Sequence, residues 1–134
     1  MDYCTCTTDD PLSKLVFVHE FGHSFAYLAD EYVGSVSYND LYPQGVEPVE
    51  ANITRELDRE KIKWKAFLSP DVELPTPKSA KTSNLVGAFE GGGYVAKGMY
   101  RPQAVCWMGS PSPKAGMCVV CRQALAQMID FYTQ

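Results

Sequence analysis

The sequence predicts a helix-dominated α+β fold for its 134 residues. Apolar residues over 12–29 cover more than one face of a long helix, and those near the C-terminus recur at helical spacing on one face, which indicates two helices. Two short apolar segments, 85–89 and 94–96, flank a run of glycines and favour extended arms around a turn. The composition, 46% hydrophobic and 21% charged residues, is that of a globular domain able to bury one core.

Charge and hydropathy exclude two classes of partner. The net charge is -4 and the chain has no basic run, which argues against nucleic acid. No apolar stretch approaches the 18 or more residues of a membrane span. Residues 1–10 also lack the charged and apolar regions of a signal peptide.

The first predicted helix begins at Asp10-Pro11, with Asp10 as N-cap and Pro11 at the first helical position. It continues through Ala29. Its apolar residues cover more than one face, as in a buried helix. They are Leu15, Val16, Val18, Phe21, Phe25 and Leu28.

This helix carries the pattern His19-Glu20-Phe21-Gly22-His23. Histidines four residues apart share one helix face, so both imidazoles can bind one zinc ion. Glu20 is then placed to take a proton from the attacking water of a hydrolytic reaction. The alternative is that His19 and His23 are two histidines of an ordinary amphipathic helix.

The middle of the chain predicts two loops and one further helix. Residues 32–48 and 69–84 are rich in turn-forming residues and lack a sustained period, which indicates loops. Between them, Thr54 is predicted to cap a helix that runs to about Leu68. We assign this helix a scaffold role.

The glycine run Gly91 to Gly93 has two interpretations. It can simply turn the chain, or it can let the backbone approach a substrate or metal closely. The last helix is predicted to open with the segment Cys118 to Cys121, and its apolar residues form one face. That face comprises Met117, Cys121, Ala124, Leu125, Met128, Ile129 and Tyr132.

Three separated blocks carry a family resemblance. They are HEFGHSFAYLADEY at 19–32, FEGGGYVAKGMYRP at 89–102, and CWM followed by CVVCRQAL within 106–125. Together they resemble the IgA-peptidase family of bacterial zinc metallo-endopeptidases. That family is similar to the metzincin proteases, which share a long active-site helix and a methionine turn beneath the metal.

The resemblance implies a role for individual residues. His19, His23 and Asp30 fall on the zinc ligands, Glu20 on the catalytic glutamate, and Met108 on the methionine of the turn. On an unbroken helix Asp30 would lie about 10 Å beyond His23 along the axis, too far to share one ion. The chain must therefore leave the helix and fold back before Asp30.

One departure from the family pattern bears on this turn. Relatives usually have glycine where Tyr27 stands, and glycine tolerates the positive φ that a sharp helix exit often requires. A tyrosine makes such a turn less favourable or different in detail. Glu31 is therefore kept as the alternative third ligand to Asp30.

A second departure concerns the oxyanion. Many metzincin-like proteases stabilise it with a tyrosine hydroxyl two residues after the turn methionine, and that position here is Ser110. Tyr94, Tyr100 or Arg101 could contact the oxyanion or the substrate instead, since donors and positive charge aimed at developing negative charge lower the barrier. The other interpretation is aromatic packing and a surface arginine.

Five cysteines leave at least one unpaired within the chain. The favoured bridge joins Cys106 to Cys118 or Cys121, pins the methionine turn to the last helix, and implies an oxidising compartment. The alternative is a four-cysteine zinc site made of Cys4, Cys6, Cys118 and Cys121.

Taken together, the expectation is a zincin-like catalytic domain spanning 1–134, with Zn²⁺ as cofactor and a peptide or protein as substrate. Only eighteen residues precede His19, whereas a twisted sheet precedes this helix in metzincin-like enzymes. We therefore expect the C-terminal part of a longer catalytic domain, whose N-terminal part would be a partner. A secreted or extracytoplasmic location follows from the resemblance. The alternative function is a non-catalytic remnant or binding module that keeps the scaffold.

Overall fold

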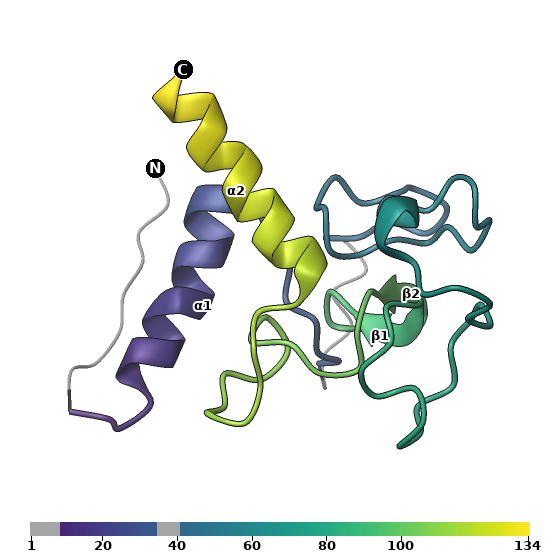
Figure 1. The fold of residues 1–134 in the computed structure, drawn as a ribbon, viewed down its shortest axis with the longest axis horizontal. Helices are drawn as coiled ribbons and strands as arrows, with labels where there is room; N and C mark the ends of the chain where they lie inside the picture. Colours follow the sequence, from purple (N-terminus) through teal and green to yellow (C-terminus); the bar gives the residue numbers. More distant parts are fainter. Residues whose placement is uncertain (1–8, 35–40) are drawn as a thin grey trace.

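Two helices and one small antiparallel sheet are joined by long irregular segments (Figure 1) in the computed structural model, which describes residues 9–34 and 41–134. Helices α1 (Ser13–Ala26) and α2 (Val119–Thr133) pack against each other. Strands β1 (Phe89–Gly92) and β2 (Val95–Arg101) form the sheet. This architecture confirms the predicted α+β class.

Helix α1 is shorter at both ends than the sequence predicted. It begins at Ser13 after Leu12 rather than at Pro11, because the Asp10 carboxylate accepts the Leu12 N–H at 2.6 Å in a preceding turn. It ends at Ala26 rather than Ala29. Tyr27 then takes the left-handed conformation, with φ of 51°.

The end of α1 is a Schellman-type cap. The Tyr27 N–H donates to the His23 carbonyl at 3.1 Å, and the Leu28 N–H donates to the Gly22 carbonyl at 3.2 Å. These bonds satisfy carbonyls that a helix end leaves unpaired. The predicted exit from the helix between His23 and Asp30 is thus confirmed, with tyrosine in the place that glycine usually fills.

The hairpin of β1 and β2 contains the glycine run. Phe89 pairs with Arg101 and Gly92 with Val95, with an irregularity between Glu90 and Gly92. The two predicted arms are therefore strands, displaced by a few residues toward the C-terminus. A short 3₁₀ helix, η1 (Lys65–Phe67), precedes them in the chain.

The helix predicted from Thr54 to Leu68 is wrong, since only η1 is helical there. Thr54 instead pairs with Tyr100: the Thr54 N–H donates to the Tyr100 carbonyl at 3.0 Å, and the Tyr100 N–H returns a bond of 2.8 Å. Trp64 is buried and donates its indole N–H to the Gly87 carbonyl. Tertiary pairing uses the backbone groups that a helix would need.

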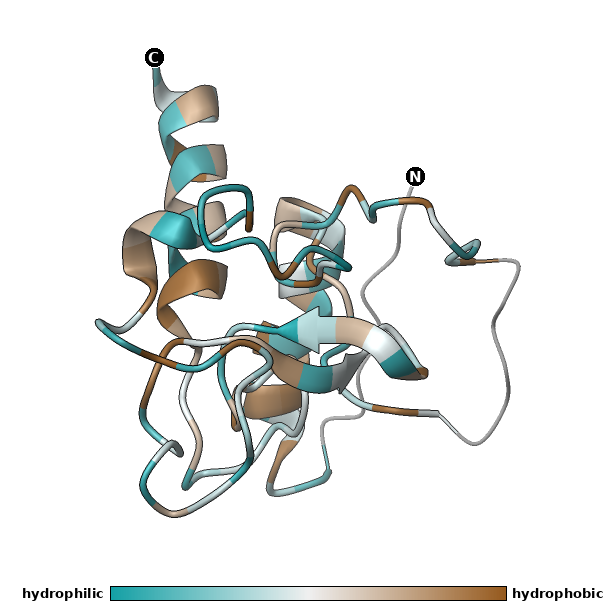
Figure 2. Cartoon of the chain, turned by 90° about the vertical axis from the view of Figure 1, so that its right-hand side faces the viewer, coloured by the Kyte–Doolittle hydropathy of each residue, from teal (hydrophilic) through white to brown (hydrophobic). Residues whose placement is uncertain are grey.

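The main core is built from the end of α1, the segment 62–88, the segment around Met108 and the first turns of α2. Its buried residues are Ala26, Leu28, Ile62, Trp64, Ala88, Cys106, Met108, Met117, Cys118, Val120, Cys121 and Ala124. A smaller core surrounds Ile53 and Met99. Polar and apolar residues alternate along α2 (Figure 2), as expected of a helix with one buried face. In the part of the chain that the structure describes, neither helix is long and apolar enough to cross a membrane.

Two predictions fall partly outside the described residues. The loop predicted over 32–48 includes 35–40, and the four-cysteine site includes Cys4 and Cys6. The loop predicted over 69–84 is confirmed, because this segment contains turns and bends but neither helix nor strand.

Candidate active site

Two imidazoles on one face of α1 meet at their Nε2 atoms. The His19 and His23 Nε2 atoms are 3.0 Å apart, as the spacing of four residues predicts. Each Nδ1 contacts a backbone carbonyl, that of Trp107 at 2.9 Å for His19 and that of Leu28 at 2.6 Å for His23. A carbonyl only accepts, so each Nδ1 carries the proton and each neutral ring directs an Nε2 lone pair toward the other.

Asp30 completes a group of three donor atoms. Its Oδ1 lies 3.1 Å from the His19 Nε2 and 3.3 Å from the His23 Nε2. The Gly93 N–H donates to the Asp30 carbonyl at 2.7 Å, which anchors this residue to the turn of the hairpin. The turn at Tyr27 and this anchor together bring Asp30 back beside the helix.

The three converging atoms favour a positive charge between them. The Asp30 Oδ1 is buried without a hydrogen-bond donor when both Nε2 atoms are unprotonated. Although burial lowers the pKa of both imidazoles, hydrogen bonding to Asp30 and to backbone carbonyls raises it overall. A proton or a metal cation would relieve the repulsion among the lone pairs.

The spacing of the group fits zinc. A tetrahedral zinc ion with bonds of about 2.0–2.1 Å to nitrogen and oxygen separates its ligand atoms by about 3.3 Å. The three separations here are 3.0, 3.1 and 3.3 Å. Neutral imidazole and carboxylate are also the donor types of catalytic zinc sites. His19, His23 and Asp30 therefore satisfy the requirements of such a site in both chemistry and geometry.

Tyr94 holds the other oxygen of the Asp30 carboxylate. Its hydroxyl donates to the Asp30 Oδ2, and the Tyr32 hydroxyl donates to the Tyr94 hydroxyl at 3.2 Å. Tyr94 stands in the hairpin turn with φ of 64°, and its N–H donates to the Tyr32 carbonyl at 3.0 Å. These bonds direct Oδ1 toward the histidines.

Met108 lies directly beneath the histidine-bearing helix. It is fully buried, and a Cβ added to Gly22 would approach its Sδ to 2.8 Å. The Met108 carbonyl accepts the Glu31 N–H at 2.8 Å, and the preceding carbonyl, that of Trp107, holds His19. Gly22 and Trp107 were not predicted to have these roles, because both roles depend on the packing of segments that are remote in the chain.

Comparison with known proteins identifies the family. The sequence model of the family described as IgA Peptidase M64 matches residues 1–82 and 78–129. The chain belongs to this family. No curated protein matches the chain. Membership in IgA peptidase M64 implies peptidase function and a protein substrate.

The described structure of this IgA peptidase M64 chain places Glu20 next to the group. Glu20 lies on α1, directly after His19 in the chain, and its side chain is half-buried. Its carboxylate lies within electrostatic range of His23 and of Tyr32. It is therefore on the side of the helix where the three donor atoms meet.

The three residues proposed for oxyanion or substrate contact occupy different surroundings. Tyr94 lies beside Asp30, whereas Tyr100 packs against the main core. The Arg101 guanidinium is buried and donates to the carbonyls of Glu90 and Gly91. Neither Tyr100 nor Arg101 hydrogen-bonds to the His19, His23 and Asp30 group within the described chain. The structure thus brings only Tyr94 of these three to the group.

A pocket of about 320 Å³ opens beside the segment that follows Asp30. Its lining includes Tyr32, Val33 and Ser110, which lies two residues beyond Met108. Lys78 and Arg101 supply its positive charge. Ser110 therefore lines a hollow that it shares with Glu31 and Cys106, and none of His19, His23 and Asp30 is among the residues that line it.

The predicted disulfide is absent. Cys106, Cys118 and Cys121 are free and buried, and the Sγ atoms of Cys106 and Cys121 are 3.8 Å apart, far beyond the 2.03–2.05 Å of an S–S bond. The inference of an oxidising compartment from such a bridge loses its basis. Glu31, the alternative third ligand of the histidine site, points toward these cysteines instead.

Proposed function

We propose that this IgA peptidase M64 chain is a zincin-like, zinc-dependent endopeptidase in which His19, His23 and Asp30 hold the metal. The observation that carries the proposal is the convergence of two imidazole nitrogens and one carboxylate oxygen within 3.3 Å of one another. The zincin-like fold is supported by the helix that ends just after His23 and by Met108 packed beneath it. The substrate is a peptide or protein, and the site of action is extracytoplasmic.

The residues of the chain prepare this site before any substrate arrives. The Trp107 and Leu28 carbonyls select the tautomer that exposes each Nε2, and Tyr94 orients the Asp30 carboxylate. Partners of this kind raise ligand basicity and hold ligands in position. Preorganisation matters because a ligand misplaced by an ångström loses both metal affinity and rate.

Glu20 is the proton carrier of the proposed reaction. When bound, zinc supplies Lewis acidity to the scissile carbonyl and to the attacking water. Glu20 accepts a proton from that water and delivers it to the nitrogen of the departing amine. The carboxylate suits both tasks because it lies beside the three donor atoms but holds none of their positions.

Metal content and cleavage measured together test the proposal. The full chain, purified without a metal-chelating tag, would be compared with Asp30→Ala and with the exposed-site control Asp130→Ala by elemental mass spectrometry. We expect Asp30→Ala to contain about one zinc ion per chain fewer than wild type and the control to match wild type. Wild type should also cleave members of a peptide library.

Two results would contradict the proposal. Unchanged zinc content in Asp30→Ala would remove Asp30 from the ligand set. A zinc-loaded wild type that cleaves no peptide or unfolded protein would instead indicate the non-catalytic scaffold.

A further inference from the structure

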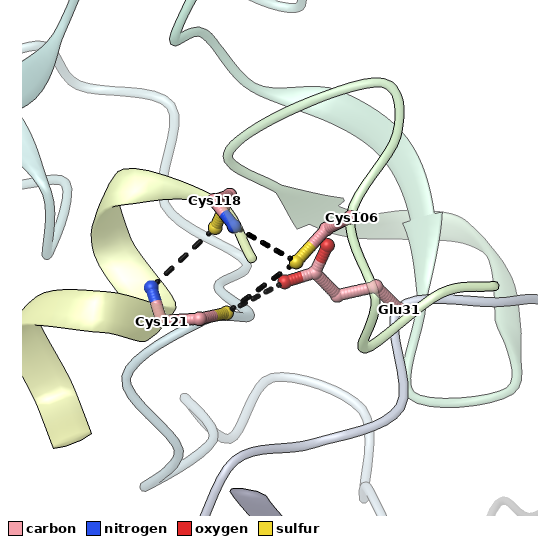
Figure 3. Close-up of side chains that lie close together, drawn as sticks. All are labelled: Glu31, Cys106, Cys118 and Cys121. Atoms are coloured by element: carbon pink, nitrogen blue, oxygen red, sulfur yellow. Dashed lines mark hydrogen bonds between the residues drawn. The ribbon is translucent and has the colours of Figure 1, made fainter. Parts of the chain in front are cut away.

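Glu31, Cys106, Cys118 and Cys121 converge in the protein interior (Figure 3), where the three cysteines belong to the main core. They come from three segments: the chain that follows Asp30, the turn before Met108, and the first turn of α2. All four are buried, with exposed fractions of 2%, 2%, 3% and 0% in that order. Their donor atoms all lie within 4.8 Å of one another.

We propose that these four residues form a second metal site, which holds a structural Zn²⁺ ion through three thiolates and one carboxylate oxygen. The proposal is independent of the endopeptidase function, because it uses none of the residues assigned to catalysis. All four ligands come from the protein and all four are buried, which is typical of closed structural sites rather than catalytic ones.

The distances within the cluster match zinc coordination. Bonds of about 2.3 Å to sulfur place two thiolates of a tetrahedral site about 3.8 Å apart, and about 3.5 Å separates a thiolate from a carboxylate oxygen. The Cys106 and Cys121 Sγ atoms are 3.8 Å apart, and the Cys121 Sγ lies 3.2 Å from the Glu31 Oε1. A disulfide among these three cysteines would also leave one thiol unpaired.

The Glu31 carboxylate lacks a full set of partners without an ion. Asn52 donates its amide to Oε1 at 3.0 Å, but Oε2 is buried with no hydrogen-bond partner. A buried, charged carboxylate oxygen without a donor is unfavourable unless a cation compensates it. A divalent ion between Glu31 and the thiols supplies that compensation.

Backbone groups prepare the sulfur atoms as ligands. The Cys118 N–H donates to the Cys106 Sγ at 3.3 Å, and the Cys121 N–H donates to the Cys118 Sγ at 3.4 Å. Cys118 caps α2, where the positive end of the helix dipole stabilises thiolates. The spacing Cys118-x-x-Cys121 is the usual half-site of structural zinc.

Arg101 moderates the charge of the proposed site. Three thiolates and one carboxylate carry four negative charges, so the site would keep two negative charges after Zn²⁺ is bound. The Arg101 guanidinium lies within electrostatic range of both Glu31 and Cys106. This charge compensation explains why Arg101 is buried. A surface residue or a residue that contacts substrate would not need to be buried.

Elemental analysis of matched variants tests the proposal. Four proteins that each comprise residues 1–134 would be compared: wild type, His19→Ala/His23→Ala, Cys118→Ser/Cys121→Ser, and the control Cys4→Ser/Cys6→Ser. We expect about two zinc ions per chain in wild type and in the control, and about one after removal of either ligand pair. Retention of one ion without the histidines separates this site from the catalytic one, even if the endopeptidase proposal fails.

Cobalt substitution keeps the test decisive if the cysteine variant does not fold. The His19→Ala/His23→Ala protein loaded with Co²⁺ should show the intense near-ultraviolet absorption of thiolate-to-cobalt charge transfer. Wild type should show the same band. Absence of the band from both proteins, or its loss in the Cys4→Ser/Cys6→Ser control, would overturn the proposal. Detection of a disulfide among Cys106, Cys118 and Cys121 in the native protein would also overturn it.

Discussion

Asp30 and Glu31 are adjacent in the chain, yet their carboxylates face two different clusters. The Asp30 Oδ1 lies 3.1 Å from the His19 Nε2, and the Glu31 Oε1 lies 3.2 Å from the Cys121 Sγ. Successive side chains of an extended segment point to opposite sides, so one short segment serves both groups. Any displacement of this segment should affect both groups together.

Glu20→Gln should abolish peptide hydrolysis without loss of zinc. The substitution removes the proposed proton acceptor but no ligand, and a general base of this kind contributes about 10²- to 10⁴-fold in rate. Cleavage of a peptide substrate and zinc content would be measured side by side. The exposed residue Glu60 offers the matched control Glu60→Gln, which should behave as wild type. Full activity in Glu20→Gln would show that another group carries the proton.

Tyr94→Phe should weaken zinc binding at the histidine site by about 10- to 100-fold, because it removes the donor that orients Asp30. Competition with a chelator of known affinity would measure the change. Tyr32→Phe provides the comparison, since the Tyr32 hydroxyl donates to the Tyr94 hydroxyl, whereas the Tyr94 hydroxyl donates directly to the Asp30 Oδ2. Equal losses in the two variants would argue against a specific role of the Tyr94 to Asp30 hydrogen bond.

Gly22→Ala should lower the free energy of unfolding by about 1–3 kcal/mol. Its new Cβ would lie 2.8 Å from the Met108 Sδ and 3.4 Å from a Leu28 methyl group, within a packed core. Urea denaturation would measure the effect, with Gly116→Ala as control because a Cβ there meets nothing within 4 Å. Addition of Met108→Ala to Gly22→Ala should cost less than the sum of the single changes. Strict additivity would contradict the contact.

Tyr27→Gly should stabilise the protein, by about 1 kcal/mol. Tyr27 adopts φ of 51° at the end of α1, a conformation that is unfavourable for residues other than glycine, and its side chain is 65% exposed. Tyr27→Val should destabilise it, because a β-branched residue tolerates positive φ poorly. Thermal and urea unfolding would rank the three proteins. A less stable Tyr27→Gly would show that the tyrosine side chain makes compensating contacts.

Local sequence patterns predicted those features of the fold and the site that depend on residues close together in the chain. Helical periodicity alone placed His19 and His23 on one face. The apolar pattern near the C-terminus predicted a helix that opens at Cys118, which is the N-cap of α2. Geometry along the helix also required a turn before Asp30. These features involve residues within a few positions of one another, where propensity and spacing decide.

Only the tertiary structure decided the remaining features. Threonine is a common helix cap, and Thr54 was predicted to be one. In the structure the backbone of Thr54 instead forms two hydrogen bonds with the backbone of Tyr100. Which side Asp30 and Glu31 face, and which cysteines gather around Glu31, likewise depends on segments up to 90 residues apart in the chain. Such contacts form only when a core buries them together, because their free energy comes from burial and mutual hydrogen bonding rather than from local conformation.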